Sequence, residues 1–301
     1  MTNPEFVHLH CRSWFSFLRG ASPPEALAHA AHLCGHAHVA LTDVNGTYGA
    51  VRFQQACRTY GINGIIGAEV MPSALLRREL DLKQRAQQAP SHAVVLLAKS
   101  LEGYANICRL LTWYHTSVPD ALVLEQHRSF RQDTICIASY SAKLRELIAA
   151  GEDQVVLQWL RQLQAIYGQD LFVELTHHAV PSERLYSKRL QQLSQWAAIP
   201  TLATNSVKYA TPEEAQRLDL LTCIRLGIAL DEPHPARPLN RDAYFKPALA
   251  TDALPVEAIQ ATLAVAEQCQ CSLLKDQVQS PPARIPAEYT QREYLAKLCY
   301  S

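Results

Sequence analysis

Two histidines and an arginine near the start of the chain have the residue types and spacing of an altered metal site. His8 and His10 stand two residues apart, so in an extended strand both imidazoles would lie on one face. Neutral imidazoles are suited to zinc, iron or manganese. Arg12 follows two residues later on the same face, where its permanent positive charge would repel a metal ion. The pattern therefore predicts a metal site that is damaged or put to another use.

Glu69 is a second candidate, because it stands in the apolar run Ile65 to Val70. A carboxylate beside an apolar strand needs a partner or a metal to offset its desolvation. Parallel sheets carry their chemistry at the carboxyl ends of the strands, so polar residues that follow predicted strands are also candidates. These residues are Thr42, Asp43, Glu174, His177, His178, Asn205, Ser206 and Lys208.

Short β-branched runs alternate with helical stretches, and these elements must position the candidate residues. The predicted strands cover 6–9, 39–41, 65–70, 93–98, 134–138, 171–175 and 201–203. The predicted helices cover 23–34, 49–60, 102–116, 142–149, 153–167, 181–197 and 212–225. This alternation predicts an α/β fold with a parallel sheet, either closed as a barrel or open and doubly wound.

Composition excludes several classes of protein. The chain has no apolar run of about 18 residues and no signal-peptide pattern at its start, so we expect a cytoplasmic protein without a membrane span. Its 28 basic and 28 acidic residues balance, so it lacks the basic excess of a free-standing nucleic-acid binder. Its nine scattered cysteines are expected to be reduced thiols rather than disulfides or zinc ligands.

Five blocks of the sequence resemble the polymerase and histidinol phosphatase (PHP) domain of bacterial C-family DNA polymerases. They are FVHLHCRSWFSFLRGA (6–21), ALTD with YGAV (40–43 and 48–51), IIGAEV (65–70), HAVVLLAK with EGY (92–99 and 102–104), and LATN with TPE (202–205 and 211–213). The opening block is most similar to the error-prone, translesion branch. The resemblance implies a distorted seven-stranded (βα)7 PHP barrel over residues 1–275. Residues 276–301 would then be a proline-rich linker and the truncated start of the next, polymerase domain.

The resemblance also implies a cluster of metal ligands at one barrel mouth, which in some family members hydrolyses phosphoester bonds. Matching ligand positions are retained at His10, Glu69 and His92. The other matched positions have changed, to Arg12, Arg19, Val44, Ser206 and Lys208. A glutamate expected after the fifth strand has no clear counterpart in residues 139–143. His8 lies outside the family ligand set, and His8 and Asp43 are possible neighbours of the site.

Three of the changed positions, Arg12, Arg19 and Lys208, carry cations where metal charge would otherwise lie. We therefore expect these side chains to pair with Glu69 and Asp43 in an ion-pair network with no bound cofactor. Such a domain would be a non-catalytic structural or interaction module of an error-prone DNA polymerase, in DNA replication and translesion repair. Its partners would be the remainder of the polymerase chain and, through that polymerase, DNA.

Two other functions are compatible with the sequence. The first is a residual metal-dependent phosphoesterase, with one zinc or manganese ion at His10, Glu69 and His92. The second is a phosphate-binding barrel with the three cations at its mouth. The resembled full-length protein is a DNA-directed DNA polymerase, but its palm lies beyond the matched blocks, so the sequence does not decide whether this chain is an enzyme. The oligomeric state is not predicted.

Overall fold

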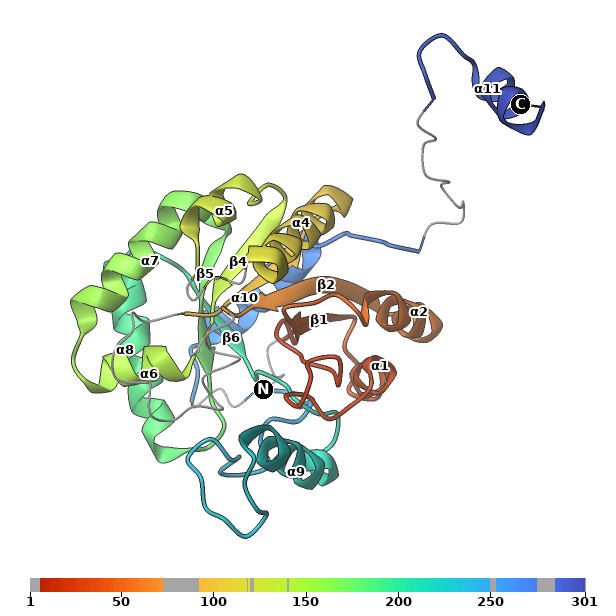
Figure 1. Cartoon of the computed structure of the whole chain (residues 1–301). Helices are drawn as coiled ribbons and strands as arrows, with labels where there is room; N and C mark the ends of the chain where they lie inside the picture. Colours follow the sequence, from red (N-terminus) through yellow and green to blue (C-terminus); the bar gives the residue numbers. More distant parts are fainter. Residues whose placement is uncertain are drawn as a thin grey trace.

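The computed structural model of the chain is a curled sheet surrounded by helices (Figure 1). It describes residues 6–72, 92–117, 119, 122–139, 141–249, 253–274 and 285–300. Within these residues one six-stranded sheet has the order β1-β2-β3-β4-β5-β6. The strands are β1 (His38–Val44), β2 (Asn63–Val70), β3 (Val94–Ala98), β4 (Thr134–Ala138), β5 (Leu171–Thr176) and β6 (Thr201–Thr204). The α/β class is thus confirmed, whereas the seven-strand count is not.

The prediction of a wholly parallel sheet is wrong at β3. Strand β3 runs antiparallel to both β2 and β4, and the other neighbouring strands are parallel. All five residues of β3 are buried, and a continuously buried apolar run carries no information about strand direction. As a result, the amino end of β3 lies beside the carboxyl end of β2, where Val70 pairs with Val94. Residue His92, which precedes β3, is therefore placed at the edge where the other strands end.

The helices cover the outside of the curl, as Figure 1 shows for α4, α7 and α8. Each predicted helix is present within two residues of its expected bounds, except that the last begins as a 3-10 turn. These elements are α1 (Pro24–Leu33), α2 (Ala50–Tyr60), α4 (Leu101–Ser117), α6 (Ala142–Ala149), α7 (Asp153–Tyr167), α8 (Pro181–Trp196), η2 (Pro212–Glu214) and α9 (Ala215–Leu226). The structure adds α5 (Leu124–Ser129), η1 (Gly168–Asp170), α10 (Val256–Gln268) and α11 (Gln291–Tyr300).

Residues 6–12 close the gap between the two edges of the sheet, although the predicted strand 6–9 does not form. Only single bridges occur, from His8 to Val39 and from Cys11 to Val207. The amides of Ala40 and Thr42 donate to the carbonyls of His8 and Cys11, so this segment advances three residues while β1 advances two. One extra residue, as in a β-bulge, reverses which side chains face inward. His8 and His10 therefore do not share a face, contrary to the prediction.

The inner face of the sheet changes from apolar to polar toward one mouth of the curl. Alternation along a strand places Ile65 and Glu69 of β2 on the same face, and Phe172 and Glu174 of β5 likewise. The residues of this inner face that lie further from the mouth pack with α10. They form an interior cluster that contains Val7, Leu9, Ala40, Ile65, Val95, Leu97, Ile135, Ile137, Leu202, Val265, Ala266 and Cys269. The two glutamates thus stand above an apolar floor.

The cysteines, the helices and the last residues of the chain bear on the remaining predictions. All nine cysteines are free thiols, as expected. No helix in the described part of the chain has the length and apolar character needed to cross a bilayer. The boundary at residue 275 stays a prediction, because residues 275–284 are not among those described. Helix α11, beyond them, has no buried residue.

Candidate functional site

A bidentate ion pair between Arg12 and Glu69 lies at the polar mouth of the curl. The Arg12 Nε atom donates to Glu69 Oε2 at 2.6 Å, and Nη2 donates to Oε1 at 2.8 Å. The Glu69 side chain is 2% exposed and that of Arg12 is 13% exposed. Two parallel charge-assisted hydrogen bonds in this geometry are among the strongest polar contacts in proteins. The predicted pairing of a substituted cation with Glu69 is therefore observed.

His10 lies between the two buried glutamates and donates to both. Its Nδ1 atom is 2.6 Å from Glu174 Oε1, and its Nε2 atom is 3.4 Å from Glu69 Oε2. Burial alone would lower the pKa of His10, but the charges of Glu174 and Glu69 and their hydrogen bonds raise it to about 9. The ring is consequently an imidazolium at neutral pH, and an imidazolium has no lone pair for a metal.

Glu174 is the site residue that sequence reasoning underused. It is one of the candidates at strand ends, whereas the glutamate that the family resemblance implies after the fifth strand is expected in residues 139–143 and has no clear counterpart there. In the structure Ser139 Oγ donates to Glu174 Oε2 at 3.0 Å, and Thr204 Oγ1 donates to Oε1 at 2.5 Å. The signal that could have identified it is the one used for Glu69, a lone carboxylate in an apolar strand.

The charges in this cluster compensate each other. Burial by itself would raise the pKa of Glu69, but the charge of Arg12 and the hydrogen bonds from His10 and Arg12 hold it well below its usual range. The cluster therefore contains two cations, Arg12 and His10, and two carboxylates, Glu69 and Glu174. Buried charges are tolerated when each is paired and hydrogen-bonded in this way.

His8 lies in a separate aromatic environment. Its Nε2 atom donates to the carbonyl of Lys246 at 2.8 Å, and its ring centroid is 4.1 Å from that of Phe245. Burial lowers the pKa of His8 to about 3, so the ring is neutral. The bulge in residues 6–12 explains this placement, since it turns His10 and Arg12 toward the mouth and His8 away from it.

Asp43 accepts hydrogen bonds from serines rather than pairing with a cation. The Ser13 amide donates to its Oδ1 at 2.7 Å, the Ser13 hydroxyl to its Oδ2 at 2.8 Å, and the Ser16 hydroxyl to its Oδ1 at 2.6 Å. Burial raises the pKa of Asp43 despite these contacts. Within the described residues its role is to fix the turn that follows Arg12, and the expected ion pair with Asp43 is not observed.

His92 stacks on Trp159 of α7, with ring centroids 4.1 Å apart. Burial lowers its pKa to about 4, so this ring is neutral, and its Nδ1 atom has no hydrogen-bond partner among the described residues. The residues that the structure describes contain no group of three or more histidine, cysteine, aspartate or glutamate side chains arranged to hold a metal ion. The assignment of His92 as a ligand stays a prediction.

The remaining substituted positions line the mouth. Arg19 and Lys208 border two pockets of about 240 Å³ each, and Arg145 borders both as well. Burial, followed by repulsion from Arg12, lowers the pKa of Lys208 to about 8 and that of Arg19 to about 10. Ser206 lines the second of these pockets, whereas Val44 lines a third, apolar pocket.

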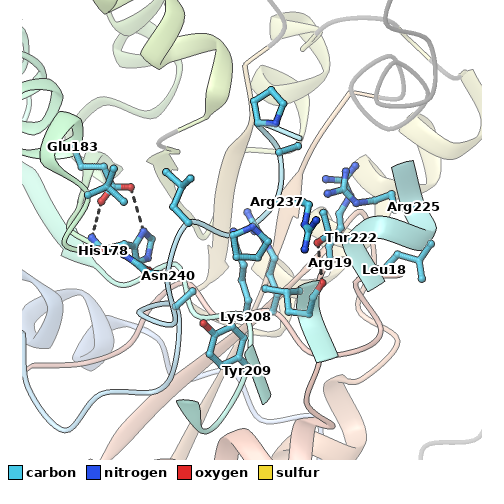
Figure 2. A pocket seen from close by; sticks show the side chains of 18 of the residues that line it. Leu18, Arg19, His178, Glu183, Lys208, Tyr209, Thr222, Arg225, Arg237 and Asn240 are labelled. Atoms are coloured by element: carbon cyan, nitrogen blue, oxygen red, sulfur yellow. Dashed lines mark hydrogen bonds and ion pairs between the residues drawn. The ribbon is translucent and has the colours of Figure 1, made fainter. Parts of the chain in front are cut away.

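Figure 2 shows the first of these pockets from close by. The labelled arginines lie on one side of it, and His178 lies on the opposite side with Glu183, to which it is hydrogen-bonded. The His178 Nε2 atom also donates to the carbonyl of Asn205 at 2.6 Å, so this histidine fixes the loop that follows β6. Of the two adjacent histidines identified in the sequence, only His178 borders the pocket. Sequence reasoning missed Arg145 and Arg225, which stand on helices rather than at strand ends.

Comparison with known proteins gives a consistent family assignment. The model of the PHP domain matches residues 8–178. The error-prone DNA polymerase of Symbiobacterium thermophilum is 32% identical over 98% of this chain, and DNA polymerase III subunit alpha of Treponema pallidum is 29% identical over 99% of it. The chain covers 28% and 26% of these proteins, so it spans about a quarter of their length. Among solved structures, an amidohydrolase of Chromobacterium violaceum with bound sulfate and no metal has a TM-score of 0.41, at 12% identity over 66% of this chain and 86% of that one.

We predict that the stabilising contribution of His10 is lost as the pH rises through about 9. The pKa of His10 is raised in the folded state from 6.5 to about 9, so its contribution to stability is complete below pH 6.5 and disappears above pH 9. Urea unfolding at pH 6.5 and 9.5 should show a loss of about 1–3 kcal/mol from this residue. In His10→Asn the amide can still donate to Glu174 but does not titrate, so this variant should lack that loss. Equal losses in the two proteins would contradict the assignment.

We also predict that Arg12→Met destabilises the protein by about 3–5 kcal/mol, because it leaves the buried Glu69 carboxylate without its cation. A matched control is Arg109→Met, whose pair with Glu102 is exposed at 53% and 52%, and which should cost less than about 1 kcal/mol. Both values come from urea unfolding at pH 7.

A double variant keeps this prediction testable if Arg12→Met fails to fold. Arg12→Met combined with Glu69→Met removes both charges and should recover most of the lost stability, because paired apolar replacements avoid the desolvation cost. A single Arg12→Met variant that is as stable as Arg109→Met would show that the pair contributes little.

Proposed function

The chain belongs to the PHP domain family, and from this premise we propose that it is the PHP module of an error-prone DNA polymerase whose metal centre has been replaced by ion pairs. In this proposal the domain does not hydrolyse phosphoesters. It acts as a structural and interaction module for the remainder of the polymerase chain, in the cytoplasm, during replication and translesion repair.

The observation that carries the proposal is the engagement of two retained ligand positions by positive charge. Arg12 holds both carboxylate oxygens of Glu69, and His10 is hydrogen-bonded to both Glu69 and Glu174, whose charges raise its pKa. A metal at these positions would have to displace the guanidinium and remove a proton whose pKa is about 9. The metal that the family resemblance implies therefore does not fit the residues present.

The alternative of a residual phosphoesterase makes different demands on the same residues. It requires a neutral His10 and a free Glu69, and it requires His92 to join them, whereas His92 stacks on Trp159. It also places a divalent cation beside Arg12, Arg19 and Lys208, which would repel it. These contacts favour the ion-pair network over a one-metal site.

A metal-loading experiment tests the proposal. We expect the protein, purified without a histidine tag and dialysed after incubation with manganese or zinc, to retain less than about a tenth of an equivalent by elemental mass spectrometry. A reversal variant should retain at least one equivalent, because it restores neutral and acidic ligands. The variant carries the substitutions Arg12→His, Arg19→Asp, Val44→His, Ser206→Asp and Lys208→His.

The reversal variant also serves as the positive control for loading, and circular dichroism establishes that it is folded. If it does not fold, the single variant Arg12→His takes its place. A full equivalent of metal in the unmodified protein that is lost in Glu69→Gln would contradict the proposal and favour the phosphoesterase.

A further inference from the structure

Three pockets meet at the mouth of the curl. Two are lined by cations and have volumes of about 240 Å³ each, and a third, more apolar pocket has a volume of about 440 Å³. Arg19 lines all three, and Leu18 and Arg225 line both the first and the third. Because they share these side chains, the three pockets lie next to each other, and we refer to them together as the recess. Small-molecule sites typically occupy about 300–1,000 Å³.

The first pocket has a strong excess of positive charge. Among the described residues of its lining, Glu183 is the single carboxylate, and it accepts a hydrogen bond from the His178 amide. The cations of the lining are Arg12, Arg19, Arg145, Lys208, Arg225 and Arg237. The chain as a whole is neutral, with 28 basic and 28 acidic residues, so this concentration is local. A recess lined by one sign of charge attracts counter-ions of the opposite sign.

Two of these cations form ion pairs with acidic side chains. Arg12 is paired with Glu69 and Arg237 with Asp219. Lys208 has no ion pair with any acid in the described part of the chain. Burial and then repulsion by Arg12 lower its pKa to about 8, and burial and then repulsion by Arg19 lower the pKa of Arg225 to about 10. A bound polyanion would relieve this repulsion.

The third pocket presents aromatic rings to solvent beside these cations. Phe17 is 79% exposed and Tyr48 is 65% exposed, and both line the pocket with Phe15, Val44 and Ile224. Exposed large apolar side chains gathered at one recess mark a binding surface. Aromatic side chains that stand next to cations are typical of surfaces on which nucleobases stack while their phosphates meet positive charge.

We propose that this recess binds a nucleoside polyphosphate, with its phosphates among Arg19, Lys208 and Arg225 and its base against Phe17 and Tyr48. Several cations favour a polyphosphate over a single phosphate, and the adjoining aromatic pocket favours a nucleotide over an inorganic anion. The shared residues Arg19 and Arg225 stand where the two parts of the ligand join. The inference rests on the proposed function in one respect, that cations rather than metals occupy the mouth.

Isothermal titration calorimetry in a buffer with EDTA tests the two halves of the site. The probes are dATP, inorganic triphosphate and deoxyadenosine. We expect dATP to bind about tenfold more tightly than triphosphate, because only dATP stacks a base. Deoxyadenosine, which has no charge for the cations, should bind more weakly than either.

Two variants separate the base contact from the phosphate contact. Phe17→Ala should weaken dATP binding about tenfold and leave triphosphate binding unchanged. Lys208→Gln should weaken both, because it removes a charge from the phosphate pocket. Matched controls are Tyr300→Ala, an aromatic side chain exposed at 93% on α11, and Arg109→Gln, whose side chain is exposed on α4; neither should change binding.

Each contrary result overturns the inference in a defined way. Equal affinities for dATP and triphosphate, with no effect of Phe17→Ala, would show a simple polyanion site. Tighter binding of a single-stranded oligodeoxynucleotide than of dATP would assign the recess to a DNA strand instead. Absence of binding by any probe would refute it altogether. If metal analysis finds a bound ion but dATP still binds in EDTA, the proposed function fails and this inference stands.

Discussion

Two carboxylates buried at one end of an apolar curl impose the constraint on which the rest of the site depends. Glu69 and Glu174 stand above an interior cluster of aliphatic side chains, where an uncompensated negative charge would be unstable. A metal ion is one way to neutralise such a pair, and a guanidinium with an imidazolium is another. This chain has the second, through Arg12 and His10. In the proposed function, this network takes the place of metal charge at the same carboxylates.

The bulge in residues 6–12 places His10 and Arg12 beside these carboxylates. If the segment were a regular strand, His8 and His10 would share a face. The extra residue between the His8 and Cys11 bridges lets Leu9 pack in the interior while His10 and Arg12 reach the glutamates. The direction of β3 also decides which residues lie at the mouth. Because β3 is antiparallel to β2, its amino end lies there beside the carboxyl end of β2.

The helices and strands that the hydrophobic pattern predicted are present except the strand over 6–9, because periodicity is encoded in local residue types. The family resemblance predicted the Arg12–Glu69 pair, because both residues stand at matched ligand positions. Neither the pattern nor the resemblance predicted the direction of β3, whose buried run reads the same either way, or the bulge, which depends on pairing with two distant segments. Glu174 was identified as a candidate, but its contact with His10 spans 164 positions and has no local signal. The positions of Arg145 and Arg225 at the mouth could not be predicted from strand ends, because both residues stand on helices.

Nitrogen NMR of the His10 ring, assigned by comparison with His10→Asn, tests the central claim most directly. With the ion-pair network in place, we expect both ring nitrogens to be protonated at pH 7.5, the ring to titrate with a midpoint near the pKa of about 9, and added zinc to leave its signals unchanged. A neutral His10 at pH 7.5 with a nitrogen signal that shifts on addition of zinc would contradict this expectation. Such a result would mean that the metal centre, and not the ion-pair network, compensates the buried carboxylates.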